Sequence, residues 1–186
     1  MNRLMRVVTI FAVAACASSQ ASRSDTSSSS GMQSGASSSG MQSGSGMSGG
    51  QSFSAKMDAQ SEVPQPNVGS AMPSCTATFQ SDGQSLTYKV DAQGLSSPFT
   101  AAHIHVGPPG VAGPVVAPLK MTDNGNGSAS GSGTVDASSI KGKNPDGSAM
   151  SMKDVVTLLG SGNAYVNVHT QNNKAGECRG QIEASR

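Results

Sequence analysis

Short runs of alternating polar and apolar residues, separated by Gly, Pro, Asn and Asp, extend from Ser52 to Arg186. Successive side chains of a β-strand point to opposite faces, so this alternation is typical of strands that bury one face. Turn-forming residues recur between the runs at short intervals, as they do in antiparallel sandwiches and barrels. The pattern therefore predicts an all-β fold over residues 52–186, a Greek-key antiparallel β-sandwich.

The strands expected from this pattern are 53–59, 75–79, 85–92, 101–106, 115–121, 127–135, 164–170 and 177–182. One short helix is expected among them. Ser151 and Asp154 have the spacing of a capping box, and the apolar residues of 155–159 provide a side that can be buried. Gly160 and Gly162 are suited to end this helix.

The chain has three cysteines, at positions 16, 75 and 178. Alternation places Cys75 on the same strand face as Phe79, and Cys178 on the same face as Ile182, so both thiols point into the expected core. Export into an oxidising compartment favours disulfide formation. The sequence therefore predicts a disulfide between Cys75 and Cys178.

The first 15 residues have the organisation of an export signal. Arg3 and Arg6 make a positive start, and an apolar stretch follows over residues 7–15. Nine residues are too few to cross a bilayer, which takes about 20, but they match the apolar part of a signal peptide. The small residues directly before Cys16 resemble the lipobox of bacterial lipoproteins.

That resemblance implies cleavage before Cys16, attachment of a diacylglyceryl group to its thiol and acylation of the new amino terminus. The expected product is an exported protein held in the cell envelope by its lipid, which more than one acyl chain makes stable. Ala17, in place of an Asp, points by analogy to the outer membrane. The alternative is an ordinary secretory signal cut at a nearby Ala.

Residues 16–51 consist almost entirely of Ser, Gly, Met, Gln and Ala. Such a segment cannot bury enough apolar surface to offset its chain entropy, so it is expected to be a disordered tether. The net charge of the whole chain is +1, and no basic cluster is present. Nucleic acid is therefore not an expected partner.

Two long motifs resemble the CHRD (chordin-type) domain. The first covers 102–108 and 111–116, and the second covers 163–170 and 176–182. The resemblance covers about residues 53–183 and implies an immunoglobulin-like β-sandwich. One departure is Cys178, where the family usually has an aliphatic residue, and a half-cystine is a small apolar substitute. Most bacterial members have no known function, so the resemblance indicates a fold rather than an activity.

The three histidines of the chain are His103, His105 and His169, and all lie in these two motifs. Residues two apart on a strand project from one face, so His103 and His105 could share a ligand. If the strand with His169 lies beside theirs, three neutral imidazoles suit copper or zinc. The alternatives are hydrogen bonds from the imidazoles to neighbouring loops, and polar contacts with a ligand.

Copper–zinc superoxide dismutases show a faint similarity, but they use more histidines and an aspartate, so dismutase activity has little support. The chain also has no nucleophile elbow, phosphate-binding loop or paired-carboxylate motif, and no enzymatic activity is expected. Alternation further predicts that four polar or aromatic residues point outward and form an exposed binding surface: Tyr165, Asn167, Glu177 and Arg179.

The leading hypothesis is a lipid-anchored envelope protein whose sandwich is a non-enzymatic binding module, without a cofactor, for an unknown protein or small molecule. The second is a copper- or zinc-binding protein that uses the three histidines. A structural spacer is the third.

Overall fold

The computed structural model describes residues 50–185; the expected leader, Cys16 and nearly all of the tether lie outside them. The elements in this range are β1 (Gln51–Asp58), β2 (Ser74–Ser81), β3 (Leu86–Gln93), β4 (Phe99–Val106), β5 (Val115–Leu119), β6 (Thr122–Gly125), β7 (Ser128–Val135), the 3-10 helix η1 (Ala137–Ser139), α1 (Met152–Gly160), β8 (Ala164–Thr170), β9 (Cys178–Gln181) and β10 (Glu183–Ala184). No helix among them is long and apolar enough to span a membrane.

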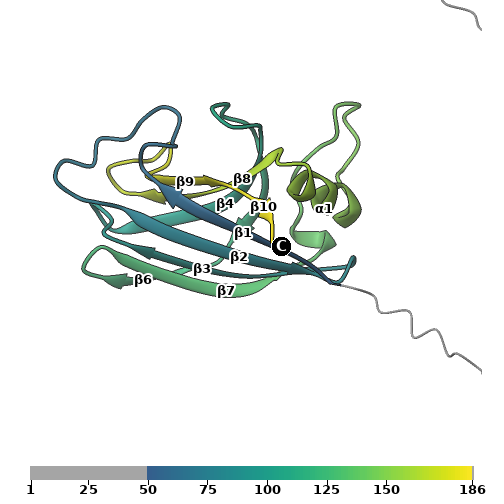
Figure 1. The fold of residues 1–186 in the computed structure, drawn as a ribbon, viewed down its shortest axis with the longest axis horizontal. Helices are drawn as coiled ribbons and strands as arrows, with labels where there is room; N and C mark the ends of the chain where they lie inside the picture. Colours follow the sequence, from purple (N-terminus) through teal and green to yellow (C-terminus); the bar gives the residue numbers. More distant parts are fainter. Residues whose placement is uncertain (1–49, 186) are drawn as a thin grey trace, which may run out of the picture. The chain divides into compact units, whose positions relative to one another are not determined.

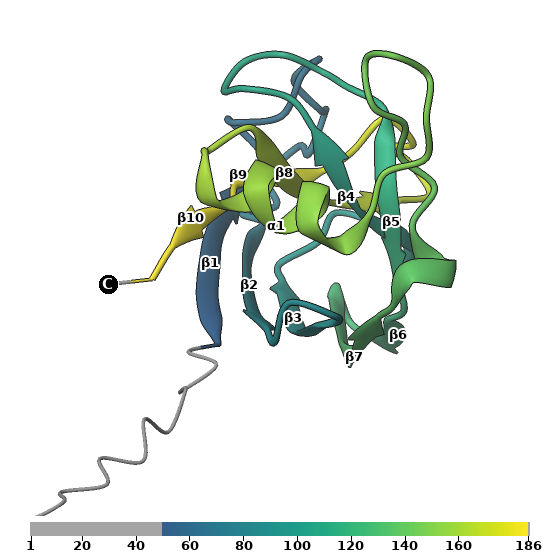
Figure 2. The same ribbon diagram turned by 90° about the vertical axis from the view of Figure 1, so that its right-hand side faces the viewer.

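The strands form one curled antiparallel sheet in the order β5-β4-β8-β9-β1-β2-β3-β7-β6, with β10 paired to β1. The curl produces two layers, one containing β5, β4, β8 and β9 and the other containing the remaining long strands (Figures 1 and 2). The layers are joined where Asp58 of β1 pairs with Arg179 of β9. Strands β4 and β8, and likewise β3 and β7, are neighbours without being consecutive, so the chain crosses between the layers. The predicted all-β sandwich is confirmed.

The core lies between the two layers and follows from the alternation. On β1 to β3, every second residue is buried, including Phe53, Phe79 and Val90. Cys75 and Cys178 are both buried and form the predicted disulfide between β2 and β9, with their Cα atoms 6.5 Å apart. The disulfide therefore connects the two layers through the core.

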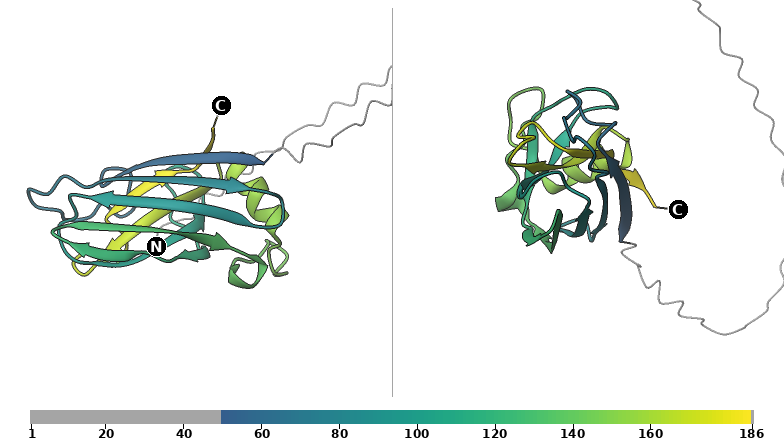
Figure 3. Two further views of the ribbon diagram at one scale, coloured as in Figure 1. Left: turned by 90° about the horizontal axis from the view of Figure 1, so that it is seen from below. Right: turned by 90° about the vertical axis from the view of Figure 1, so that its left-hand side faces the viewer.

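Helix α1 lies at one end of the sandwich, beside β8 and β10 (Figures 2 and 3). The predicted capping box is present: the Ser151 hydroxyl accepts a hydrogen bond from the Asp154 amide, and the Asp154 carboxylate accepts one from the Ser151 amide. Met152, Val155 and Leu159 are buried on one side of the helix. The helix thus covers an end of the core that the strands leave open.

Three details of the elements differ from the sequence prediction. Strand β1 starts at Gln51, the last residue assigned to the tether. The strand expected over 115–121 ends at Leu119, and a separate strand, β6, follows. Strand β6 turns into β7 through Asn126 and Gly127, which have φ angles of 53° and 70°, as a two-residue hairpin requires.

Candidate metal centre

The outer face of β4, β8 and β9 is largely buried, although the sequence predicts that it is exposed. All seven residues of β8 are buried, which includes Tyr165, Asn167 and His169 on the face opposite the core. Arg179 on β9 and Glu177 just before it are buried as well. The alternation correctly predicts which way these side chains on the strands point, but the expected exposed binding surface is wrong.

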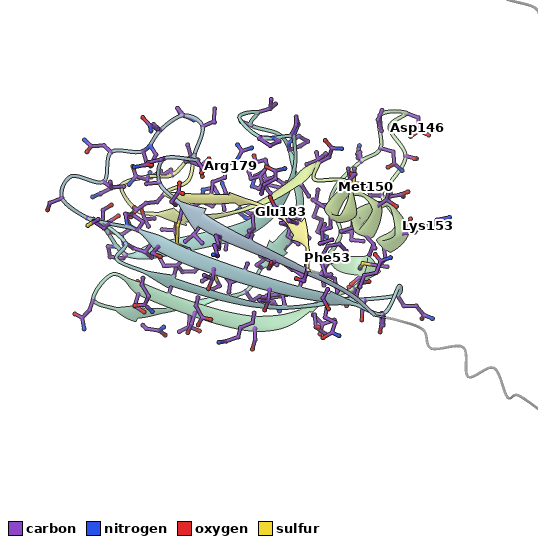
Figure 4. The ribbon with its side chains drawn as sticks, in the orientation of Figure 1. Phe53, Asp146, Met150, Lys153, Arg179 and Glu183 are labelled. Carbon is purple, nitrogen blue, oxygen red and sulfur yellow. A yellow bond between two sulfur atoms is a disulfide. The ribbon has the colours of Figure 1, made fainter. Side chains whose placement is uncertain are left out.

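Two loops cover this face and explain its burial. The β1–β2 loop contributes Glu62, which accepts a hydrogen bond from the Asn167 amide. The β4–β5 loop contributes three carbonyl groups, which accept hydrogen bonds from His105 and Arg179. Both loops rise on the β8–β9 side of the sandwich, and Arg179 lies on that side of β9 (Figures 1 and 4). The domain therefore has a small polar interior beside its apolar core.

The three histidines meet in this polar interior. His103 and His105 come from β4 and His169 from β8, and one nitrogen from each ring lies within 4.8 Å of the other two. His103 Nδ1 and His169 Nε2 are 3.0 Å apart. Strand pairing produces this cluster, because Ala101 is the register partner of His169 and places it diagonally to His103. The geometry thus joins the residues that the sequence proposed as a metal-binding set.

Backbone carbonyl groups orient two of the rings. His105 Nδ1 lies 2.8 Å from the Gly113 oxygen, and His169 Nδ1 lies 3.0 Å from the Lys174 oxygen. A carbonyl can only accept, so each Nδ1 carries the hydrogen and each Nε2 of the neutral ring keeps its lone pair. His105 Nε2 is buried and has no hydrogen-bond partner. This is the outer-sphere pattern that orients histidines bound to metals.

The surroundings favour neutral imidazoles. Burial, followed by the charges of His169 and His105, lowers the pKa of His103 to about 4. Burial also lowers the pKa of His105 and of His169, although their hydrogen bonds to backbone carbonyl groups act in the opposite direction. A metal ion binds only the deprotonated nitrogen, so the site does not have to release protons near neutral pH.

Tyr165 and Arg179 form one wall of the polar interior. The Tyr165 ring stacks on His105, with 4.8 Å between centroids and 11° between planes. The Arg179 guanidinium lies 3.5 Å from the centroid of the same tyrosine ring, a cation–π contact. The Tyr165 hydroxyl accepts a hydrogen bond from the Gly113 amide at 3.1 Å. Tyr165 therefore holds the His105 ring by stacking, and Arg179 and Gly113 in turn hold Tyr165.

Asn167 and Arg179 are incompletely paired. Arg179 Nη2 donates to the carbonyl groups of Pro108 and Val111, at 3.2 and 2.9 Å, but Nη1 has no partner. The Asn167 Nδ2 donates to Glu62, whereas its Oδ1 has no partner. Burial raises the pKa of Glu62. Within residues 50–185, no carboxylate lies within salt-bridge distance of Arg179.

Glu177 does not belong to this cluster. Its carboxylate accepts hydrogen bonds from the Ser96 amide at 2.6 Å, the Ser96 hydroxyl at 2.7 Å, the Thr170 hydroxyl at 2.5 Å and the Asn173 amide at 2.8 Å. Burial raises the pKa of this carboxyl, but the four hydrogen bonds outweigh it and the pKa is lowered. Glu177 therefore ties the β3–β4 loop to the β8–β9 loop.

Sequence reasoning did not identify Glu62 or Gly113 as parts of the site. Gly113 approaches the backbone of Val106 so closely that a Cβ atom would collide with its carbonyl oxygen. Gly113 lies in the first motif. The glycines and prolines there predict a loop, but they do not indicate that Gly113 contacts His105. Glu62 lies in a loop without periodicity, so no sequence pattern indicated which residue it meets.

A family model for the CHRD domain matches residues 53–182. The chain belongs to the CHRD family. The matched range contains the three histidines, Arg179 and both half-cystines of this CHRD domain. No curated protein and no solved structure matches the chain.

Proposed function

We propose that this CHRD domain binds one copper or zinc ion through His103, His105 and His169, and that a lipid on Cys16 holds it in the cell envelope. Membership of the CHRD family supports only the more general part of this proposal, that the domain is a β-sandwich binding module. The observation that carries the metal proposal is the buried, unpartnered Nε2 of His105 beside two further imidazole nitrogens. A buried polar atom without a partner is costly, and a metal ion would satisfy this one.

The chemistry of the three side chains supports this choice of ions. Imidazole nitrogen is a common ligand of copper and zinc, and it binds in its neutral form. The lone pairs of His105 and His169 Nε2 are already freed by hydrogen bonds on the opposite ring atoms. Between His103 and His169, an ion would take the place of the hydrogen that joins the two close nitrogens, and this hydrogen would move to the other nitrogen of the His103 ring. Three protein ligands leave a fourth position of a tetrahedral centre open.

The metal proposal is tested by titrating the full-length lipoprotein, purified in detergent, with Cu(II) and with Zn(II) in separate calorimetric experiments. We expect one equivalent to bind at micromolar concentrations or below. His105→Gln should lose most of this affinity, because it removes the imidazole whose Nε2 has no partner. Asn172→Ala, an exposed change in the β8–β9 loop, is the matched control. Wild-type protein that binds neither ion at micromolar concentrations would refute the proposal.

The anchor rests on the sequence of residues 1–16 and is tested separately. We expect labelled palmitate to be incorporated into the wild-type chain and the protein to sediment with membranes. Cys16→Ser should abolish both, while Cys75→Ser leaves the label in place. Incorporation of label by the Cys16→Ser variant would contradict lipidation at this residue.

A further inference from the structure

Three buried polar side-chain atoms have no hydrogen-bond partner in residues 50–185: His105 Nε2, Asn167 Oδ1 and Arg179 Nη1. All three belong to the outer face of β4, β8 and β9. His103, Asn167 and Arg179 form one row across these strands, because Asn167 is the register partner of both others. Side chains paired in this way have Cβ atoms about 4.5–5.5 Å apart. The unpaired atoms of Asn167 and Arg179 therefore belong to neighbouring residues, and His105 lies two positions from His103 on the same face of β4.

A cation alone would leave this group unsatisfied. His105 Nε2 and Asn167 Oδ1 are acceptors, and the metal ion of the proposed function would satisfy the imidazole nitrogen. Arg179 Nη1 is a donor and needs an acceptor. Glu62 interacts electrostatically with this guanidinium, but it forms no salt bridge with it, and burial raises the pKa of Glu62 and so disfavours its charged form. The missing component is thus an anion that lies close to Arg179.

The guanidinium and the amide are close enough to the histidines to act on the same ligand. Asn167 is paired with His103 on one side and with Arg179 on the other, so all three side chains project from neighbouring positions of the same face. Arg179 and His105 also contact the same tyrosine ring. Arg179 is thus linked to His105 through Tyr165 and to His103 through Asn167.

A cleft leads to Arg179 from outside. Its volume is about 270 Å³, and it lies between the β1–β2 loop at Gln60–Val63 and the β4–β5 loop at Pro109–Gly110. Arg179 and Gln181 of the β9 strand line the same cleft. Its size is enough for a small anion with a few non-hydrogen atoms. The cleft offers such an anion a path that ends at a cationic side chain.

We propose that the fourth coordination position of the metal is reserved for a small anion, such as a carboxylate or hydrogencarbonate, that enters through this cleft and accepts a hydrogen bond from Arg179 Nη1. This inference rests on the proposed function, since the anion binds to the metal. Asn167 Oδ1 accepts a hydrogen bond from the anion when it is protonated, or from a water molecule that takes its place. Arg179 and Asn167 are positioning residues for this exchangeable ligand.

Azide is a suitable probe, because it binds Cu(II) and the azide-to-copper charge-transfer band reports the bond. The full-length protein loaded with Cu(II) should develop this band and saturate as azide is added. Arg179→Gln should retain copper but bind azide about tenfold more weakly or worse, since it loses a charge-assisted hydrogen bond. Lys89→Gln removes an exposed cation from β3 and should leave the azide affinity unchanged.

Arg179 also donates hydrogen bonds to the β4–β5 loop, so its replacement can disturb the fold as well as the anion site. A second variant that keeps Arg179 is therefore needed. Asn167→Asp keeps the shape of the side chain and places a negative charge beside the open position. It should likewise weaken azide binding about tenfold or more, by repulsion. Wild-type protein that binds neither copper nor zinc would overturn both proposals. Copper binding without an azide band, or with azide affinities unchanged in both variants, would overturn this inference alone.

Discussion

At the scale of single residues, His103 shows how the polar interior changes proton affinity. Its pKa is lowered from 6.5 to about 4, chiefly because burial disfavours the charged ring. The folded state therefore binds fewer protons than the unfolded state between these two values. By linkage, the free energy of unfolding of the metal-free protein must decrease as the pH is lowered through this window.

We expect His103→Gln to reduce this pH dependence, because glutamine does not titrate. Urea unfolding of metal-free protein at pH 7, 5.5 and 4 measures the effect. The wild type should lose more stability between pH 7 and 4 than the variant does. Identical losses in the two proteins would show that His103 titrates normally in the folded state.

Glu177 is the second residue with a predicted energetic effect. Its replacement by alanine leaves the donors of half-buried Ser96 and of buried Thr170 and Asn173 without their acceptor. Each unsatisfied buried donor costs energy, so we expect Glu177→Ala to lower the free energy of unfolding at pH 7 by about 2–4 kcal/mol. Glu183→Ala, an exposed change on β10, is the control and should have little effect. Equal denaturation midpoints for the two variants would argue against the role assigned to Glu177.

What the sequence could and could not predict also differs residue by residue. The direction of Tyr165, Asn167 and Arg179 was predictable, since neighbouring side chains on a strand alternate. Their burial was not, because alternation says nothing about what covers a face. The histidine cluster was predictable only on condition that β4 and β8 are neighbours, and strand order depends on contacts between residues far apart in the chain.

At the scale of elements, most strands and the helix follow from local pattern. The capping box defined the start of α1, and glycine-bearing turns separated the strands. Strand β6 was missed because all four of its residues are exposed, so it has no apolar alternation. Strand β10 has two residues, too few for any periodicity. Elements stabilised mainly by pairing with a neighbour thus leave little trace in the sequence.

The β4–β5 loop gives a prediction at this scale. A Cβ atom at Gly113 would collide with the Val106 carbonyl oxygen, and backbone atoms cannot move aside cheaply. Gly113→Ala should displace the carbonyl group that orients His105, and it should weaken copper or zinc binding about 10–100-fold, as changes to outer-sphere partners do. Isothermal titration measures the affinity. Val111→Ala, an exposed change in the same loop, should bind metal normally. Unchanged affinity in Gly113→Ala would show that the loop does not position His105.

At the scale of the whole molecule, one covalent bond joins the two layers. The disulfide links residues 103 positions apart, and closing so long a loop removes much of the entropy of the unfolded chain. We expect the double variant Cys75→Ala/Cys178→Ala to lose about 4–5 kcal/mol of stability, with a matching decrease in the thermal midpoint. Wild-type protein with and without reductant provides the comparison. A midpoint that neither reduction nor substitution lowers would contradict this role.

Strand β8, buried on both sides, is a partition between two interiors with different chemistry. On β4, β8 and β9, the even-numbered positions such as Ile104, Val166 and Cys178 face the apolar core. The odd-numbered positions such as His105, Asn167 and Arg179 face the polar interior. Substitutions at even-numbered positions of these strands should therefore mainly change thermal stability. Substitutions at odd-numbered positions should mainly change ligand affinity. Binding could then diversify among related sequences while the sandwich that supports it is kept.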